Sequence, residues 1–381
     1  MTTVRSILTP TAVLRLALGW GTILVLALSG SLLEPPVPGP LLLGALAVII
    51  AVILVCAFGV VHEAEHLARR LGDPYGSLVL TLSIVLIEVI LISAVMLGPG
   101  DHTTIARDSV MAVSMIILNA VVGLCLLVGG LRHRELTPNR AGTTAYLAML
   151  VVLVSLAFAL PAVIGRGGSY STGQAIGIGA LTVALYAFFL ARQMGPQAGD
   201  FREVTVRVRD AEHGDAAAAR PVPVTQVIAE HRVEVVLRLV LLVVTVLPIV
   251  LLSHDMAALL DDGLGRVGAP VALAGVLIAM IVFLPESITS VRAALRGEIQ
   301  RVSNLCHGAL VSTVGLTIPS VLVIGMLTGQ TVVLAESPAN LLLLGVSLLL
   351  SVTTFTGPRV SAVHGAAHLA VFAVYGIALF S

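Results

Sequence analysis

Long apolar stretches make up most of this chain. Residues 40–61 are one example, because their side chains carry no charge at all. About 20 apolar residues cross the hydrocarbon core of a bilayer as a helix. Only 11% of the chain is charged, against about 25% in soluble domains. We therefore predict an all-α membrane protein with about eleven transmembrane helices. The expected spans are residues 12–33, 40–61, 76–98, 108–130, 143–164, 173–193, 233–253, 268–294, 303–327, 338–356 and 361–380.

The arginines predict the orientation of these spans. All 21 basic residues are arginines, and short cytoplasmic loops of membrane proteins are enriched in them. With a cytoplasmic N-terminus, only Arg107, Arg166 and Arg266 fall outside, so the other 18 (21 − 3) fall inside. The C-terminus is then external, and residues 254–266 form an acidic outer loop. The net charge of zero argues against nucleic acid as a partner.

A single long polar segment, residues 195–231, separates two groups of five spans. Its charged start, alanine run and prolines are typical of a flexible linker. Because five is odd, the second group must be inverted relative to the first. Inverted five-helix repeats are an architecture of secondary transporters. The predicted domains are an extra N-terminal helix (1–36), a first repeat (37–194), a cytoplasmic linker (195–231) and a second repeat (232–381).

Two carboxyl groups lie deep within predicted spans. Glu88 and Glu286 each occupy the second helix of a repeat, and each lies in an L-x-E-x-I sequence. An ionised carboxylate at the bilayer centre costs about 2.5–3.5 kcal/mol on insertion scales, and no arginine is deep enough to neutralise it. Each group must be protonated, hold a cation, or alternate between the two. The pair therefore indicates exchange of cations for protons.

Pro285 precedes the second glutamate. A proline has no N–H, so it releases the carbonyl four residues earlier, here that of Ile281. A released carbonyl beside a carboxylate suits a hard cation. Other side chains near the two glutamates are candidate supporting ligands, although each also fits ordinary helix packing. These are Ser83, Asn119, Ser290, Asn304, His307 and Ser312. His307 is also a candidate for the proton path.

Residues 67–96, 268–305 and 365–375 together resemble the calcium/cation:proton antiporter family, in its ChaA-type branch, within the calcium/cation antiporter superfamily. The resemblance covers nearly the whole chain. It implies an extra first helix, two inverted five-helix repeats, and one essential glutamate in each repeat, which fall on Glu88 and Glu286. It also implies exchange of Ca²⁺, Na⁺ or K⁺ for protons.

Several positions depart from the calcium-selective members of this family. Ile84 and Val85 stand where those members carry Gly-Asn, Phe283 where they carry Asn, and Ser312 where they carry Gln. Calcium requires six to eight oxygen ligands. Without these amide oxygens the site has fewer ligands for Ca²⁺, so monovalent cations are also candidate substrates.

Residues 62–66 read H-E-A-E-H, which fits the H-E-x-x-H signature of zinc peptidases. A zinc site requires a third ligand, and Asp261 in L-L-D-D-G is a candidate. The predicted topology places His62 and Asp261 on opposite sides of the membrane. A charged cytoplasmic extension of the helix, with an i,i+4 pair of Glu65 and Arg69, is the simpler interpretation.

Two histidine pairs at i,i+4 spacing lie at the predicted cytoplasmic side: His62 with His66, and His364 with His368. Histidine titrates near physiological pH. As a hypothesis, these four side chains adjust transport activity to internal pH.

The sequence thus predicts a multi-pass protein of the bacterial inner membrane that exchanges cytoplasmic cations for protons, with no resident cofactor. Inorganic cations, protons and the lipid bilayer are the expected partners. Two other classes stay open. An intramembrane zinc protease would retain zinc on purification, and a passive channel would conduct cations without moving protons. Midplane glutamates without a repeated carbonyl filter favour a carrier over a channel.

Overall fold

The computed structural model describes residues 7–30, 37–71, 103–133, 136–203, 231–270 and 272–380. It also describes seven positions of the third expected span: Leu82, Val85, Glu88, Val89, Ile92, Ser93 and Met96. Within these residues the chain is helical, with short turns and two isolated bridges in place of any sheet.

The chain divides into two compact units, each drawn from both halves of the sequence. Unit 1 is Met1–Ala94 with Ala218–Pro285, and unit 2 is Val95–Ala217 with Glu286–Ser381. The helix α13 (Ala272–Leu295) contributes to both. The predicted division into an extra helix and two repeats stays a prediction.

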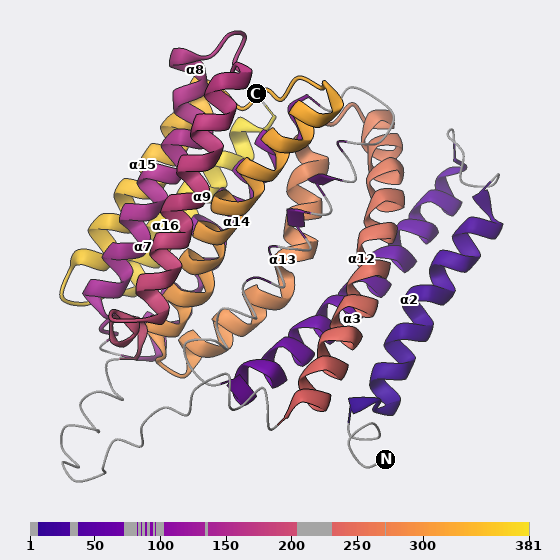
Figure 1. The fold of residues 1–381 in the computed structure, drawn as a ribbon, viewed down its shortest axis with the longest axis horizontal. Coiled ribbons are helices and arrows are strands. Elements are labelled where there is room, and N and C mark those ends of the chain that lie inside the picture. The colour runs from indigo at the N-terminus through magenta and orange to yellow at the C-terminus, as the bar shows by residue number, and fades with distance from the viewer. Residues whose placement is uncertain are drawn as a thin grey trace. The chain divides into compact units, whose positions relative to one another are not determined.

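Unit 1 is held together by three long helices that lie side by side (Figure 1). These are α2 (Pro10–Leu28), α3 (Gly39–Leu71) and α12 (Arg232–Arg266). The core between α3 and α12 is aliphatic and includes Ile49, Ile53, Ile249 and Leu252. Burial of alkyl side chains therefore stabilises the contact between the helices of this unit.

A proline in α12 determines how α2 packs against it. Pro248 lies inside α12 and has no N–H, so the carbonyl of Val244 lacks its helical donor. The indole N–H of Trp20 on α2 donates to that carbonyl at 3.2 Å. The helices approach closely at Gly19, where a Cβ would lie 2.8 Å from the Cβ of Pro248.

Unit 2 contains the remaining helices. They are α5 (Ile105–Met115), the π-helix η2 (Ile116–Val121), α6 (Val122–Arg132), α7 (Arg140–Val154), the π-helix η3 (Ser155–Ala159), α8 (Leu160–Ile164), α9 (Thr172–Met194), the 3₁₀ turn η4 (Ala198–Phe201), α14 (Ile299–Thr328), α15 (Pro338–Thr356) and α16 (Ala362–Ala378). The helices α6 and α16 pack very closely, because a Cβ on Gly365 would overlap the backbone nitrogen of Leu127. Small residues allow such approaches between membrane helices.

The start of the predicted linker docks onto unit 2. Phe201 of η4 is buried against Tyr146, with ring centroids 5.0 Å apart, and its carbonyl accepts from Asn304 Nδ2 at 2.7 Å. The carboxylate of Glu203 then accepts from the backbone N–H groups of Gln300 at 3.1 Å and Arg301 at 3.3 Å. These are unsatisfied donors of the first turn of α14. Residues 195–203 are therefore structured; the rest of the linker lies outside the described residues.

The expected spans agree with the described helices in most places. Among the described residues, eight helical segments are long and apolar enough to cross a membrane, with α5, η2 and α6 counted as one segment and α7, η3 and α8 as another. The helix α13 makes nine if its two bent parts form one span. The helix α16 is apolar but shorter, with 17 residues. Residues 76–98 lie mainly outside the described residues, so the count of eleven stays a prediction.

Residues 254–266 are not a loop, because α12 continues as a helix to Arg266; their external position stays a prediction. Leu259 and Leu260 are buried in the core of unit 1. Asp262 pairs with Arg266 one turn later and accepts from the backbone N–H of Val37. Apolar burial and an i,i+4 ion pair maintain the helix in spite of its charges.

We predict that Glu203 makes the stability of unit 2 dependent on pH. Burial raises the pKa of the Glu203 carboxyl to about 7, although the two backbone N–H groups oppose this. The folded state therefore keeps a proton that the unfolded chain has lost, and stability should fall as the pH rises through about 7. Thermal unfolding of Glu203→Gln should depend less on pH than that of the wild type. Glu298→Gln removes a neighbouring carboxylate that makes the smallest contribution to the pKa of Glu203, so it should change the slope less than Glu203→Gln does. Equal slopes in all three proteins would contradict the assignment.

We also predict energetic coupling between Trp20 and Pro248. Trp20→Phe removes the donor to the Val244 carbonyl and should cost about 1 kcal/mol, the usual net value of a hydrogen bond. In a Pro248→Ala background the alanine N–H can satisfy that carbonyl, so the same change should cost less. A double-mutant cycle measured by thermal unfolding tests this. Equal losses in both backgrounds would show that Trp20 acts through packing alone.

Candidate functional site

Glu286 lies on a bent helix. The parts Gly275–Ile281 and Phe283–Leu295 of α13 meet at 53°. Pro285 explains the bend, because its ring excludes the normal hydrogen bond to the carbonyl of Ile281. The side chain of Glu286 follows directly and is buried, with 4% exposed. The helix thus has a buried carboxyl at Glu286 and lacks one backbone hydrogen bond, to the Ile281 carbonyl, about one turn earlier.

Two small side chains, Ser290 and Cys306, lie near Glu286 within unit 2. Ser290 is fully buried one turn later, and Cys306 Sγ of α14 donates to Ser290 Oγ at 3.6 Å. No arginine forms an ion pair with Glu286 in the described part of the chain. An isolated charge in such a place is very costly, so the carboxyl must bind a proton or a cation.

Glu88 is buried as well, with 8% of it exposed. Val85, Ile92 and Met96 are also buried and recur three or four residues apart, so they share one helix face with Glu88. The expected supporting residue Ser83 lies outside the described residues. Glu88 belongs to unit 1 and Glu286 to unit 2.

The other candidate ligands form two groups within unit 2. Ser290 and Ser303 are buried near Cys306 and His307, and Ser303 Oγ lies 2.9 Å from His307 Nδ1. The Nε2 atom of His307 is buried and has no hydrogen-bond partner among the described residues. It is thus available for a proton or a polar ligand.

Asn119, Asn304 and Ser312 already have partners. In η2, Asn119 Nδ2 donates to Ser347 Oγ at 2.7 Å, and Asn119 Oδ1 lies 3.4 Å from His368 Nδ1. Asn304 Nδ2 donates to the Phe201 carbonyl, and the Ser312 hydroxyl donates to the Gly308 carbonyl. Their expected role as ligands stays a prediction.

The H-E-A-E-H segment lies within α3, and its first carboxylate, that of Glu63, makes an ion pair. Glu63 accepts from the guanidinium of Arg238 on α12 at 2.6 Å, and Arg238 also binds Glu234 at 3.2 Å. Glu63 and Arg238 are buried, with 5% and 8% exposed. Sequence reasoning missed Arg238, although an arginine inside a predicted span is a signal that it needs a partner.

The zinc interpretation finds no support in this arrangement. The rings of His62 and His66 meet edge to face, with centroids 4.6 Å apart. Arg238 contacts Glu63, the residue after His62. Asp261 lies 23 residues beyond Arg238 on one continuous helix, which is roughly 34 Å at about 1.5 Å per residue. Asp261 is therefore too far along α12 to bind one zinc ion together with His62 and His66. Among the described residues no group of three or more His, Cys, Asp or Glu could hold a metal.

The four histidines of the pH hypothesis have different surroundings. His62 and His66 lie in unit 1, and His364 and His368 lie in unit 2. His364 Nδ1 accepts from the backbone N–H of Ser361 at the start of α16, and His368 is fully buried. Their role in sensing pH stays a proposal.

Known proteins match this chain over most of its length. The family model described as sodium/calcium exchanger protein matches residues 41–195 and 237–380, on either side of the predicted linker. A putative ionic transporter, y4hA, of Sinorhizobium fredii (strain NBRC 101917 / NGR234) is 37% identical over 321 residues, covering 84% of this chain and 83% of that protein. The sodium-potassium/proton antiporter ChaA of Escherichia coli (strain K12) is 32% identical over 329 residues, covering 86% and 87%.

Solved structures show the same fold at low identity. The Ca²⁺/H⁺ antiporter protein YfkE has a TM-score of 0.65 at 17% identity, covering 97% of this chain and 99% of that one. The H⁺/Ca²⁺ exchanger CAX has a TM-score of 0.64 at 15% identity, covering 96% and 87%.

The buried ion pair on α3 and α12 generates a prediction. Arg238→Gln would leave the Glu63 carboxylate buried without its partner, a type of change that costs about 3–5 kcal/mol. The double variant Glu63→Gln/Arg238→Gln should recover part of this loss. Unfolding can be followed with a thiol-reactive dye, because Cys56, Cys125 and Cys306 are all buried. The pair would not be the stabilising contact if the double variant proved no more stable than Arg238→Gln.

Proposed function

Because the chain belongs to the sodium/calcium exchanger protein family, it is a membrane transporter rather than an enzyme, and we propose that it exchanges cytoplasmic cations for protons. Glu88 and Glu286 are the proposed carriers, each binding either a cation or a proton. The observation that carries the proposal is the burial of Glu286 on the bent helix α13, without an ion pair among the described residues.

Competition for one carboxyl group couples the two fluxes. A protonated glutamate is neutral and tolerates an apolar site, and a cation can replace the proton only when the carboxylate forms. Suppose that the protein can switch its opening from one side of the membrane to the other when the glutamate holds a proton or a cation, but not when the carboxylate is bare. Each cation that leaves then requires protons to enter. The cost of an uncompensated charge in the membrane provides this restriction. Two inverted repeats that rock around the site would provide the alternating access.

The ligands of the second glutamate favour monovalent cations in this proposal. The carbonyl of Ile281 and the hydroxyl of Ser290 are the oxygen donors within one or two turns of Glu286 that we assign to the cation. Phe283 is buried and contributes no oxygen, and the Ser312 hydroxyl donates to Gly308. A small oxygen set suits Na⁺ or K⁺ better than Ca²⁺, which requires six to eight ligands. One relative is named a sodium-potassium/proton antiporter.

We further propose that the protein resides in the bacterial inner membrane with its N-terminus in the cytoplasm. An inward proton gradient would then export the cation. His307 is the proposed proton-path residue, since its Nε2 atom has no hydrogen-bond partner among the described residues. His62, His66, His364 and His368 are the proposed pH-sensing residues, and alanine variants that keep the wild-type pH profile would remove them from this role.

Transport in inside-out vesicles tests the proposal. The lumen is first acidified, and a pH-sensitive dye then follows proton release as Na⁺, K⁺ and Ca²⁺ are added in turn. The wild type should release protons with each transported cation, with the larger response to Na⁺ or K⁺. Glu88→Gln and Glu286→Gln should each abolish the response, because glutamine cannot exchange a proton.

Glu65→Gln is the matched control, since it removes one carboxylate from α3, a helix that carries neither proposed carrier, and should leave the response intact. Wild-type vesicles that release no protons with any cation would reject cation/proton exchange. A normal response in both glutamate variants would reject the proposed carriers but keep the exchange.

A further inference from the structure

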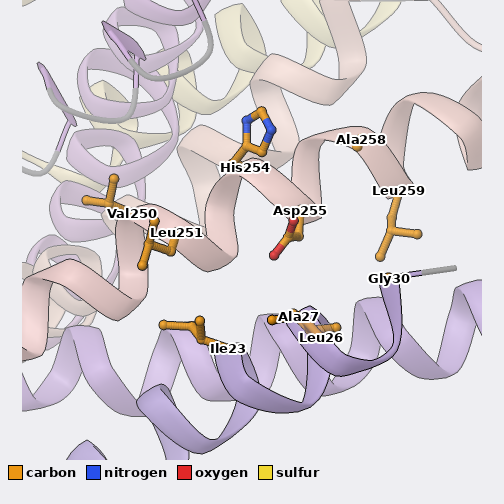
Figure 2. Close-up of a pocket in the computed structure, with 10 residues that line it drawn as sticks. All are labelled: Ile23, Leu26, Ala27, Gly30, Val250, Leu251, His254, Asp255, Ala258 and Leu259. Carbon is orange, nitrogen blue, oxygen red and sulfur yellow. The ribbon is translucent and has the colours of Figure 1, made fainter. Parts of the chain in front are cut away.

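A cavity lies between α2 and α12, within unit 1. Its volume is about 520 Å³, within the range of about 300–1,000 Å³ that small-molecule sites occupy. Figure 2 shows its walls, which are alkyl side chains of both helices, among them Ile23 and Leu26 of α2 and Leu251 of α12. Such walls favour hydrocarbon over water.

Small residues create this space. Ala27 of α2 and Ala258 of α12 line the cavity, and Gly30 closes its end. A Cβ added at Gly30 would meet no atom within 4 Å. Leu24 and Leu28, on another face of α2, are 60% and 79% exposed. That face is apolar enough for α2 to lie against the acyl chains of the bilayer.

One charged group enters this apolar space. The carboxylate of Asp255 points from α12 toward α2, whereas the neighbouring imidazole of His254 points away from α2 (Figure 2). Asp255 has no ion pair in the part of the chain that the structure describes, and Arg266, eleven residues later on α12, binds Asp262. A carboxylate beside alkyl side chains is stabilised when it is protonated or has a cationic partner.

The position of Asp255 along α12 fits a lipid headgroup. Asp255 lies 17 residues after Arg238 on the same helix, which is roughly 26 Å at about 1.5 Å per residue. The hydrocarbon core is about 30 Å thick. Arg238 and Asp255 therefore lie near opposite faces of the core, and a lipid with its headgroup at Asp255 would extend its acyl chain along α2.

We propose that this cavity binds an aminophospholipid such as phosphatidylethanolamine. Its ammonium group donates to the Asp255 carboxylate, and one acyl chain lies against Ile23, Leu26 and Leu251. Charge complementarity selects this occupant. An anionic glycerol headgroup would be repelled by Asp255, and a choline headgroup has no N–H to donate.

Native mass spectrometry of the purified full-length chain tests the proposal. Delipidated protein is titrated with phosphatidylethanolamine, phosphatidylglycerol and phosphatidylcholine that have the same acyl chains. The wild type should bind phosphatidylethanolamine at least tenfold more tightly than the other two. Asp255→Asn should lose this preference, and Ala27→Phe, which fills the cavity, should weaken binding of all three lipids at this site.

Asp262→Asn is the matched control, because it removes the same charge two turns later on α12, where Arg266 is the partner. It should bind lipid like the wild type. Equal affinity of the wild type for the three lipids, a preference for phosphatidylglycerol, or an unchanged preference in Asp255→Asn would each overturn the proposal. Thermal unfolding of every variant shows whether a loss of binding reflects misfolding. Ala27→Phe changes the volume of the cavity and Asp255→Asn changes its charge, so misfolding of one variant leaves the other as a test.

Discussion

A carboxyl group buried among apolar helices cannot stay ionised without a partner, and the proposed transport cycle depends on this constraint. Glu286 has 4% of its side chain exposed, and no arginine pairs with it among the described residues. Glu63, by contrast, is almost equally buried but is neutralised by Arg238 at 2.6 Å. The same residue type thus stabilises packing in one place and is left able to exchange ligands in another.

Prolines in the helices release backbone carbonyls, and the fate of each carbonyl differs. In α12, Pro248 releases the carbonyl of Val244, which accepts from Trp20 and so fixes α2. In α13, Pro285 releases the carbonyl of Ile281, five residues before the buried Glu286, and the helix bends by 53°. Backbone oxygens released inside a membrane are tolerated only where another donor or a cation satisfies them. That rule connects the packing of unit 1 with the proposed cation site.

The sequence predicted the helices and the buried glutamates because the bilayer imposes length and polarity on each segment separately. Ion pairs that join distant segments could not be read in this way. Glu63 and Arg238 are 175 residues apart, and Asn119 and Ser347 are 228 apart; one sequence does not show which helices pack together. The helical end of α12 was missed because Asp261, Asp262 and Arg266 resemble a loop. Only the structure reveals the buried leucines and the i,i+4 pair that keep it helical.

Cation accumulation in proteoliposomes is the most direct test of the central claim that proton and cation fluxes are coupled. The purified protein is reconstituted, the lumen is made acidic, and uptake of labelled Na⁺, K⁺ or Ca²⁺ is followed against equal or higher internal concentrations. Coupled exchange predicts accumulation above the equilibrium level, which a protonophore abolishes. Cation that merely equilibrates across the membrane, with or without the pH gradient, would contradict coupled exchange and identify a passive pathway.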